Sequence, residues 1–337
     1  MKRSILLLIC LCLVIGCSQK QEKYNDSFLS FDTYIEFTGY TSNKKEFDKY
    51  FIEVKNSFNT YHKLFDAYQN YDNINNIKSI NDNAGIKPVK VNKELFDVIN
   101  QTIIYYHGAN KKNNIALSPI INEYKIVQEN YEAGKAIVNP DMTNLKKLNQ
   151  CTNINNIVLN EAEYTVYLKK QCAKIDVGSI AKGYATDQVA QKIHKDGLHS
   201  GIINAGGNVS VIGNKNNKPF TIGIADPNNP NIYILTLNAQ DTSIVTSGDY
   251  QRYYMIDNKR MSHIIDPNTL LPANINRSVT IVSSDGLIGD YFSTECFMLN
   301  EQEIDKLAKK YHFEYIIINK KEKIIVSEGL KNDVKIK

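Results

Sequence analysis

The sequence has no long apolar run and no large excess of either charge, and each absence argues against a class of protein. Its longest uncharged apolar run, residues 5–15, falls short of the ~20 residues that a membrane-spanning helix needs. The 40 lysine and arginine residues nearly balance the 36 aspartate and glutamate residues. This balance argues against a nucleic-acid-binding protein, which usually carries a clear basic excess.

Cysteine is scarce as well. Six cysteines are present, and three of them lie at or before residue 17, which leaves Cys151, Cys172 and Cys296. Three unevenly spaced cysteines fit neither a zinc site nor a disulfide-rich scaffold. The sequence leaves open whether Cys151 and Cys172 pair in an oxidising compartment.

The first residues have the pattern of a bacterial export signal. Lys2 and Arg3 precede the apolar run, as in a signal peptide. The run ends at Gly16-Cys17, and a small residue followed by cysteine at this place resembles the lipobox of bacterial lipoproteins. We therefore predict a signal peptide over residues 1–16 and a lipid on Cys17. The alternative is an ordinary signal peptide with a chance cysteine.

Cleavage would leave a lipidated polar tether over residues 17–27 and a folded part over residues 28–337. The folded part shows no internal repeat and no long linker, so we expect one domain. The prediction is an extracytoplasmic protein, anchored by lipid to a bacterial membrane.

Periodicity predicts an α+β fold, with antiparallel or mixed sheets and flanking helices. Apolar residues three and four apart predict helices over 47–65 and 95–106. A further helix is expected over 181–195, closed by Gly197, and others from Gly289 and Glu301. Strands are predicted at 31–37, 157–159, 164–168, 174–177, 201–204, 209–213, 220–224, 232–237, 243–246, 251–256 and 279–282. Asn216-Asn217 and Asp257-Asn258 are predicted turns, and a hairpin around Lys320-Lys321 is expected near the end.

Residues 176–187, DVGSIAKGYATD, suggest an anion site. A strand would run into Gly178-Ser179, where a helix begins. Free backbone N–H groups at a helix start favour an anion, and Lys182 adds a cation in the first turn. A cation there opposes the helix dipole, which suggests that Lys182 has another role, such as contact with a phosphate. The alternative is a merely solvated lysine.

Two further segments place glycine or histidine between strands. Gly206 and Gly207 in INAGGN (203–208) permit positive φ and close approach of a ligand to the backbone, or form a plain tight turn. TSGDY (246–250) precedes SHIIDP (262–267), in which His263 is either structural or a general base near neutral pH.

The fourth segment, GDYFSTECF (289–297), suits a divalent cation. Asp290 and Thr294 are four residues apart at an expected helix start, so both project from one face. One carboxylate, a hydroxyl, water and substrate phosphates are typical ligands of Mg²⁺. The alternative is that Asp290 only caps the helix.

Taken together, these segments resemble the ApbE family of FAD:protein FMN transferases. The matches are DVGSIAKGYATD, INAGGN, TSGDYQRYY (246–254), SHIIDP and GDYFSTECF, in the family's order. The resemblance runs from about residue 28 to the C-terminus. FDTYIEF (31–37) and NNIKSINDNAG (75–85) extend it loosely into the N-terminal third.

The resemblance implies a reaction and a set of site residues. FAD binds with Mg²⁺ on its pyrophosphate, FMN passes to a Thr or Ser hydroxyl of an extracytoplasmic redox protein, and AMP leaves. By position, the carbonyl of Ser179, the carboxylate of Asp290 and the hydroxyl of Thr294 would bind the metal. His263 would activate the acceptor hydroxyl. The residues implied to bind or line the flavin dinucleotide are Lys182, Asp266, Gly206, Gly207, Thr246, Ser247, Ser118, Phe31 and Ile77.

The sequence departs from the family pattern at three places. Ser118-Pro119 stands where the family often has Asp-Pro, and Phe31-Asp32-Thr33 stands where it usually has Met-Gly-Thr. Leu270 follows Thr269 where the family usually has glycine. None of these changes touches the expected metal ligands or His263.

Two other functions compete. The protein could hold FAD or hydrolyse it to FMN and AMP, with water in place of the acceptor hydroxyl. It could instead be a solute-binding lipoprotein without catalysis, against which Asp290, Thr294 and His263 weigh. An Asp-Gly-x-Ser/Thr-Gly-Ala-Thr acceptor segment is absent from the sequence, so the chain is not expected to modify itself.

Overall fold

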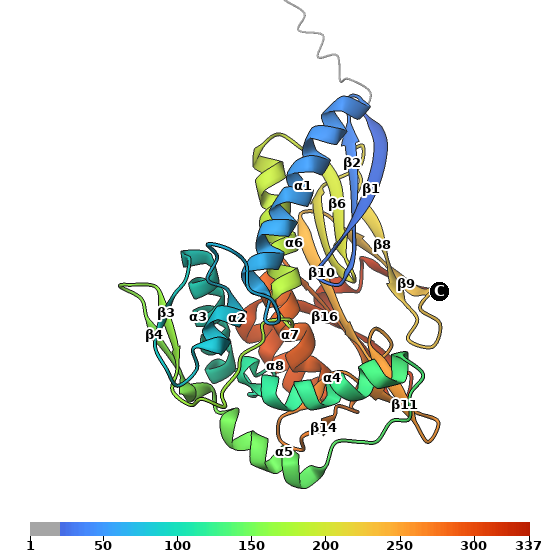
Figure 1. Ribbon diagram of the computed structural model, residues 1–337. Coiled ribbons are helices and arrows are strands. Elements are labelled where there is room, and N and C mark those ends of the chain that lie inside the picture. Colours follow the sequence, from blue (N-terminus) through green and yellow to red (C-terminus); the bar gives the residue numbers. More distant parts are fainter. Residues whose placement is uncertain (1–20) are drawn as a thin grey trace, which may run out of the picture.

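The computed structural model describes residues 21–337 (Figure 1). The predicted signal peptide and Cys17 lie outside these residues. No helix within the described range is both long and apolar enough to cross a membrane.

An eight-stranded antiparallel sheet forms the centre of the fold. In spatial order its strands are β1 (Glu22–Ser30), β2 (Thr33–Thr41), β6 (Ser200–Ala205), β7 (Asn208–Gly213), β10 (Thr242–Gly248), β15 (Asn276–Ser283), β16 (Glu314–Asn319) and β17 (Ile324–Val326). Successive side chains of a strand point to opposite faces, so each strand serves both sides of the sheet. On β10, Ser243, Val245 and Ser247 face the helices, and Ile244 faces the opposite layer.

Three helices cover one face of this sheet (Figure 1). They are α1 (Lys44–Phe65), α6 (Ala181–Lys195) and α7 (Gly286–Phe297). Helix α1 packs on β1, β2 and α6, and its Phe47 stacks on Phe37 of β2 with ring centroids 5.2 Å apart. Helix α6 packs on β6, β7 and α7, and α7 packs on β10 and β15. The site described below lies where α6 and α7 meet.

A three-stranded antiparallel sheet covers the other face. It consists of β8 (Phe220–Ala225), β9 (Tyr233–Ala239) and β18 (Val334–Ile336). Phe220, Leu235 and Leu237 pack against Val211 and Ile244 of the large sheet. The domain is therefore layered, with helices, the large sheet and the small sheet in that order.

The remaining elements pack partly against α7 and partly in a separate cluster around Tyr124, Tyr254 and Leu270. They are α2 (Ile77–Asp82), α3 (Lys93–Gly108), α4 (Ser118–Glu132), α5 (Met142–Leu148), α8 (Glu301–Tyr311), β3 (Val89–Lys90), β4 (Ile157–Asn160), β5 (Thr165–Leu168), β11 (Tyr253–Ile256), β12 (Lys259–Ser262), β13 (Ile265–Asp266), β14 (Leu271–Pro272) and four 3₁₀ turns at Ile115–Leu117, Asn149–Cys151, Ile154–Asn156 and Glu328–Leu330. Strands β3, β5 and β4 form a small sheet, and β11–β12 and β13–β14 form hairpins.

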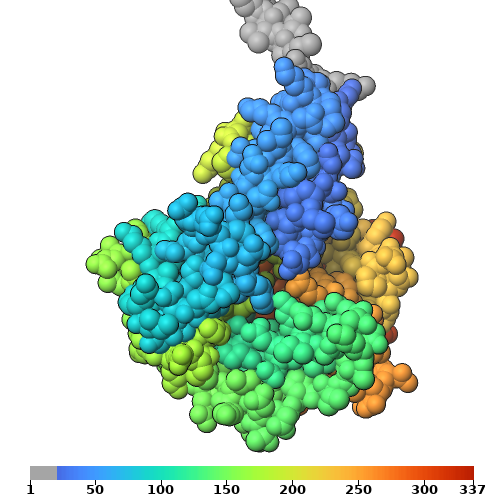
Figure 2. All heavy atoms as spheres, in the orientation of Figure 1, coloured from blue at the N-terminus to red at the C-terminus, as the bar shows by residue number. Residues whose placement is uncertain are grey.

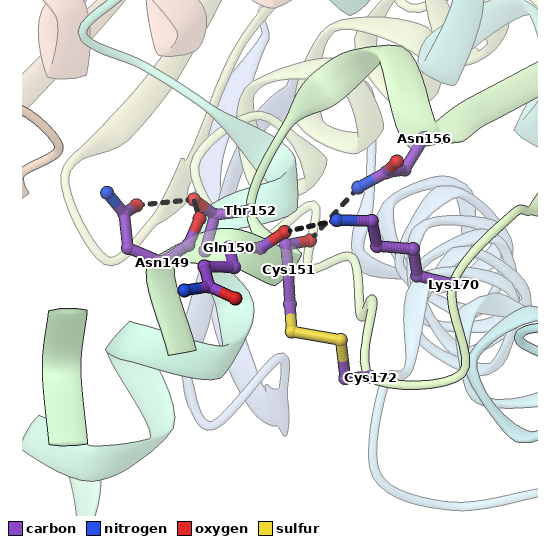
Figure 3. The surroundings of a disulfide bond; sticks show 7 residues. All are labelled: Asn149, Gln150, Cys151, Thr152, Asn156, Lys170 and Cys172. Carbon is purple, nitrogen blue, oxygen red and sulfur yellow. Dashed lines mark hydrogen bonds between the residues drawn. A yellow bond between two sulfur atoms is a disulfide. The ribbon is translucent and has the colours of Figure 1, made fainter. Parts of the chain in front are cut away.

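Cys151 and Cys172 form a disulfide in the structure, with a Cα–Cα distance of 5.6 Å (Figure 3). The bond joins the segment that follows α5 to the loop that leads toward α6. This answers the question that the sequence left open. Cys296 is free and buried in α7.

The α+β class and most predicted elements are confirmed. The helices predicted over 47–65, 95–106 and 181–195 are α1, α3 and α6, and the hairpin around Lys320 is β16–β17. The Asn216-Asn217 and Asp257-Asn258 turns have positive φ at both residues, as a two-residue hairpin turn requires.

Three expectations were wrong. The tether does not extend to residue 27, because residues 22–27 belong to β1, an edge strand whose exposed side chains in this part are polar. The strand predicted over 174–177 is a loop, whose Ile175 backbone bonds to the side chain of Asn81 rather than to a strand. Helix α7 begins at Gly286 rather than Gly289.

Candidate active site

The start of α6 brings one free backbone N–H group to the site. Ile180, the N-cap residue, supplies no side-chain cap; the Ala181 N–H donates to the Val177 carbonyl and the Gly183 N–H to Asp290, which leaves the Lys182 N–H without a partner among residues 21–337. Lys182 is half-buried in this turn and forms no ion pair with any residue from 21 to 337. The helix start predicted from Gly178-Ser179 and Lys182 is confirmed, and its geometry suits an anion.

Asp290 lies directly against this helix start. Its Oδ2 accepts a hydrogen bond from the backbone N–H of Gly183 at 2.7 Å, and only 5% of the residue is exposed. Asp285 caps α7 instead, accepting from Leu287 and Ile288, so the alternative that Asp290 is a helix cap was wrong. Burial raises the pKa of Asp290, although the nearby Lys182 and the Gly183 N–H favour the charged form.

Gly183 permits the close contact between α6 and α7. A Cβ at this position would lie 2.4 Å from the Gly286 carbonyl oxygen and 2.5 Å from Cβ of Asp290. Asp187, one turn further along α6, also contacts α7. Burial and the neighbouring Asp285 raise the pKa of Asp187 to about 6. The motif DVGSIAKGYATD is thus partly a helix-packing motif.

Thr294 follows one turn after Asp290 and joins a chain of hydroxyl groups. Its Oγ1 lies 3.3 Å from Ser247 Oγ, which lies 2.9 Å from Ser293 Oγ. The structure therefore brings Asp290, Thr294 and Ser247 to one region between α7 and β10. Thr246 points the other way, since its hydroxyl pairs with Thr280 on β15 at 2.8 Å.

Ser179 reaches the same region through Asn113. Its hydroxyl donates to Asn113 Oδ1 at 2.8 Å, and Asn113 Nδ2 donates to the Tyr291 carbonyl of α7 at 3.0 Å. Within residues 21–337, no three His, Cys, Asp or Glu side chains gather as a metal site. A metal at Ser179, Asp290 and Thr294 would instead use one carboxylate with carbonyl and hydroxyl oxygens.

Sequence reasoning missed Glu295, the residue that holds the loop over residues 110–113. Glu295 is fully buried and accepts hydrogen bonds from the backbone N–H groups of Asn110, Lys112 and Asn113, at 2.8, 3.0 and 2.5 Å. Burial raises the pKa of Glu295, and the three N–H donors favour the charged form. The sequence did hold a signal for this role, because Glu295 is a charged residue directly before the apolar Cys296-Phe297.

The same loop carries a second missed residue, Lys112. Its Nζ donates to both carboxylate oxygens of Asp266, at 2.9 and 2.8 Å. Asp266, expected to contact the nucleotide, is thus already paired, and both side chains are only about 15% exposed. Ser118 is buried at the start of α4, next in the chain after this loop.

His263 follows β12 and is oriented by the backbone. Its Nδ1 lies 3.0 Å from the Arg252 carbonyl oxygen. A carbonyl can only accept, so Nδ1 carries the hydrogen and Nε2 of the neutral ring is an acceptor. Burial and the positive charges of Arg252 and Lys182 lower the pKa of His263 to about 4, which keeps the ring neutral at pH 7.

The glycine pair forms the turn between β6 and β7. Gly206 and Gly207 have φ of +59° and +94°, and a Cβ on Gly206 would lie 2.5 Å from Thr33 Oγ1. The turn thus packs on the β1–β2 turn, where Phe31 and Asp32 also have positive φ. Phe31 packs edge-on against His62 of α1.

Most of the predicted residues lie in one region beside α6 and α7, with two exceptions, Thr246 and Ile77. Figure 2 shows the surface hollowed where the blue β1–β2 turn, the green α4 segment and orange residues of the hairpin region meet. Ile77 is fully buried in the core, so its side chain supports this region without lining it. The site combines a helix start, a buried carboxylate, hydroxyls and a neutral histidine, which suits transfer of a phosphate-linked group.

The fold and the site are those of an α+β protein suited to transfer of a phosphate-linked group, and comparison with known proteins gives the family. The ApbE family model matches residues 31–317. The chain belongs to the ApbE family, and it is a FAD:protein FMN transferase by this relationship.

Individual relatives support this assignment. The FAD:protein FMN transferase of Klebsiella pneumoniae is 31% identical over 274 residues, which cover 79% of this chain and 83% of that protein. That of Vibrio cholerae is 24% identical over 95% of this chain and 94% of its own length. The solved ApbE protein of Thermotoga maritima shares the fold, with a TM-score of 0.81, 23% identity and coverage of 93% of this chain and 99% of its own.

Proposed function

We propose that the protein transfers FMN from FAD to a Thr or Ser hydroxyl of an extracytoplasmic protein, in a reaction that depends on Mg²⁺. The observation that carries this proposal is the contact of buried Asp290 with the Gly183 N–H at the start of α6. It joins a carboxylate for a cation to a helix start for the pyrophosphate.

The residues present fit a magnesium ion. Asp290 Oδ1 has no hydrogen-bond partner among residues 21–337, and Thr294 offers a hydroxyl one turn away. Ser179 would add its carbonyl oxygen, while water and the pyrophosphate complete the coordination. When bound, the ion would neutralise charge on the phosphates.

The chain's own residues then have distinct roles. Lys182, through its side chain and its backbone N–H at the start of α6, would hold the pyrophosphate. His263 Nε2 would take the proton of the acceptor hydroxyl as that oxygen bonds to the FMN phosphorus. The bond from this phosphorus to the bridging oxygen breaks, and AMP leaves with that oxygen. The neutral ring at pH 7 supports this role.

Mass spectrometry of a reaction with FAD, Mg²⁺ and a candidate acceptor tests the proposal. Transfer adds FMN to the acceptor and releases AMP. Free FMN and AMP with an unmodified acceptor would indicate a hydrolase, and unchanged FAD would indicate a binding protein.

We also propose that the protein is exported and lipid-anchored through Cys17. The Cys151–Cys172 disulfide supports an oxidising compartment outside the cytoplasm. Changing Cys17 to Ala should leave unprocessed precursor without lipid. Unchanged lipid labelling of this variant would contradict the anchor.

A further inference from the structure

Arg252 is the one arginine among residues 21–337 whose side chain forms neither an ion pair nor a hydrogen bond within that range. The other two, Arg260 and Arg277, are both held by the buried carboxylate of Asp249. The whole sequence has only four arginines among its 40 basic residues. Since lysine supplies the charge almost everywhere else, an arginine indicates a position where the planar, two-pronged guanidinium matters. Arg252 is also exposed, so its guanidinium is free to bind a ligand.

The backbone places Arg252 directly opposite His263. Strands β11 and β12 are antiparallel, and their ladder continues one step further, because the His263 N–H donates to the Arg252 carbonyl at 3.2 Å. Directly opposed residues of such a pair have their side chains on the same face, with Cβ atoms ~5 Å apart. Side chains alternate along a strand, so this face is also that of Tyr254 and Met261, which pack toward α4. Arg252 and His263 therefore project on the side of α4, which borders the hollow in Figure 2.

The charge of Arg252 also acts on groups that lie across this hollow. Burial lowers the pKa of His263 to about 4, and the charges of Arg252 and Lys182 add to this effect. Burial and Asp176 raise the pKa of Tyr68, and the charge of Arg252 opposes that rise. Tyr68 donates to Asp176 Oδ2 at 3.1 Å, and Asp176 belongs to the loop that enters α6. Two cations without an acidic partner, Arg252 and Lys182, thus flank His263 from different elements.

We propose that Arg252 is a catalytic residue that binds the flavin-side phosphate of FAD, the phosphate whose phosphorus the acceptor attacks. His263 Nε2 must lie within hydrogen-bond reach of the acceptor hydroxyl as that oxygen approaches the phosphorus. The side chain directly opposite His263 reaches the same phosphate, and its guanidinium can donate two N–H groups to the nonbridging oxygens. Lys182 approaches the pyrophosphate from the start of α6, so the two cations hold it from both sides.

The contact acts on the transition state. As the acceptor oxygen bonds to the phosphorus, its proton passes to His263 Nε2. The bond from the phosphorus to the bridging oxygen breaks, and AMP leaves with that oxygen and the bonding electron pair. Negative charge is spread over the nonbridging oxygens, where a guanidinium already in place stabilises it. Arg252 neither gains nor loses a proton, because its guanidinium stays charged.

This inference rests on the proposed function, and a binding test separates the two because it needs no catalysis. FMN carries the flavin-side phosphate and riboflavin carries none, so the ratio of their affinities measures the phosphate contacts of the flavin half. Fluorescence titration gives both affinities, and AMP release in the reaction with FAD described above gives the rate. Absence of AMP release by the unaltered protein would contradict the proposed function, and the affinity ratio would still test Arg252.

The test variant is Arg252→Gln, which removes the charge of an exposed side chain and keeps its polarity. The control is Lys259→Gln, which removes a charge at an exposed position of the same hairpin. Affinity for FMN should fall ~10-fold in Arg252→Gln, as loss of charge-assisted hydrogen bonds predicts, while affinity for riboflavin stays within ~2-fold. AMP release should fall at least ~10²-fold, because such a donor acts mainly on the transition state. The control should match the unaltered protein in all three measurements.

Arg252→Lys separates charge from geometry. This variant should keep most of the FMN affinity and regain little of the rate, since lysine keeps the charge without the two-pronged donor. Full recovery of the rate would overturn the two-pronged contact. If Arg252 acted only through its charge on His263, Arg252→Gln would change the pH dependence of the rate and leave the ratio of FMN to riboflavin affinity unaltered. That result, or equal losses of affinity for both flavins, would overturn the inference.

Discussion

The two walls of the site are built in opposite ways. The helix wall consists of Gly183, Asp290 and Thr294, where α6 and α7 pack so closely that a single Cβ at Gly183 has no room. The hairpin wall consists of Arg252, His263 and Asp266, carried by the hairpins and loops between β10 and β15. Arg252 is exposed, and His263 and Asp266 are partly so.

This difference matches two chemical tasks. Under the proposed function, the helix wall would hold the highly charged pyrophosphate, which groups fixed on packed helices can bind without reorganisation. The hairpin wall would admit the acceptor protein, so it needs a reachable surface. Fixed contacts therefore lie on one side and adaptable charged contacts on the other.

The sharpest test of the helix wall is Asp290→Asn. Loss of the carboxylate should reduce FMN transfer ~10²–10³-fold, because charge stabilisation by a metal is worth a few kcal/mol. Titration of the rate with Mg²⁺ measures the effect, and excess Mg²⁺ should not restore the rate. A variant with normal Mg²⁺ dependence would remove Asp290 from the metal site.

The same variant should also change the pH dependence of stability. Burial raises the pKa of Asp290 in the folded state, so the fold is most stable while this carboxyl is protonated. That stability is fully present below the pKa of the unfolded chain and is lost as pH rises through the higher pKa of the folded state. A neutral asparagine side chain at this position carries no such cost. Thermal unfolding of the protein without FAD should therefore show the variant gaining stability relative to the unaltered protein between acidic and neutral pH.

On the hairpin wall, His263→Ala should slow transfer ~100-fold, as loss of a general base does, while FAD affinity is retained. Since the pKa of His263 is lowered to about 4, the rate of the unaltered protein should stay level below pH 6.5 and fall only near pH 4. Rates of single turnovers against pH measure both effects. A variant that transfers at nearly the normal rate would make His263 structural.

Glu295 connects the two walls, so its variant tests whether they act together. Glu295→Gln replaces one carboxylate oxygen with an NH₂ group, which would face the Asn110 N–H in place of Oε1 or the Lys112 and Asn113 N–H groups in place of Oε2; either clash of donors costs ~1–3 kcal/mol. The loop that orients Ser179 and Lys112 should loosen, and the Kd for FAD should rise ~10-fold with a smaller change in the rate at saturation. Glu301→Gln, on the exposed face of α8, is the control. Loss of thermal stability with unchanged FAD affinity would show that Glu295 only supports the fold.

The helix wall was the more predictable from sequence. Helices α1, α3 and α6 follow from local periodicity, and Asp290 with Thr294 follows from their spacing. The start of α7 was misplaced because Gly289 looked like a boundary, whereas the cap is Asp285. Local pattern finds helix faces but does not decide which of two acidic residues caps.

The contacts of the hairpin wall and of the loop over residues 110–113 could not be predicted from local sequence patterns. The pairing of Lys112 with Asp266 spans 154 residues, and the contact of Glu295 with Asn110 spans 185. The first part of edge strand β1, residues 22–27, was read as a tether because its exposed side chains are polar. Leu270 also departs from expectation, with a φ of +60° where the family usually has glycine, and its buried side chain packs in the cluster of Tyr124 and Tyr254.

The smallest expected effect is at Lys182, which lies on the helix wall but is less buried than Asp290. Lys182→Ala removes a half-buried cation that has no ion pair among residues 21–337, and a cation in a first helical turn opposes the dipole. The helix should therefore tolerate the change, and Lys182→Ala should even favour it slightly. FAD affinity should fall ~5-fold, as loss of ~1 kcal/mol of phosphate attraction predicts, while riboflavin, which lacks phosphate, should bind unchanged. Fluorescence titration of both ligands gives the comparison. Equal loss for both would show that the Lys182 side chain shapes the pocket without contacting phosphate, and the anion site would then retain only the backbone N–H of residue 182 and the positive end of the α6 dipole.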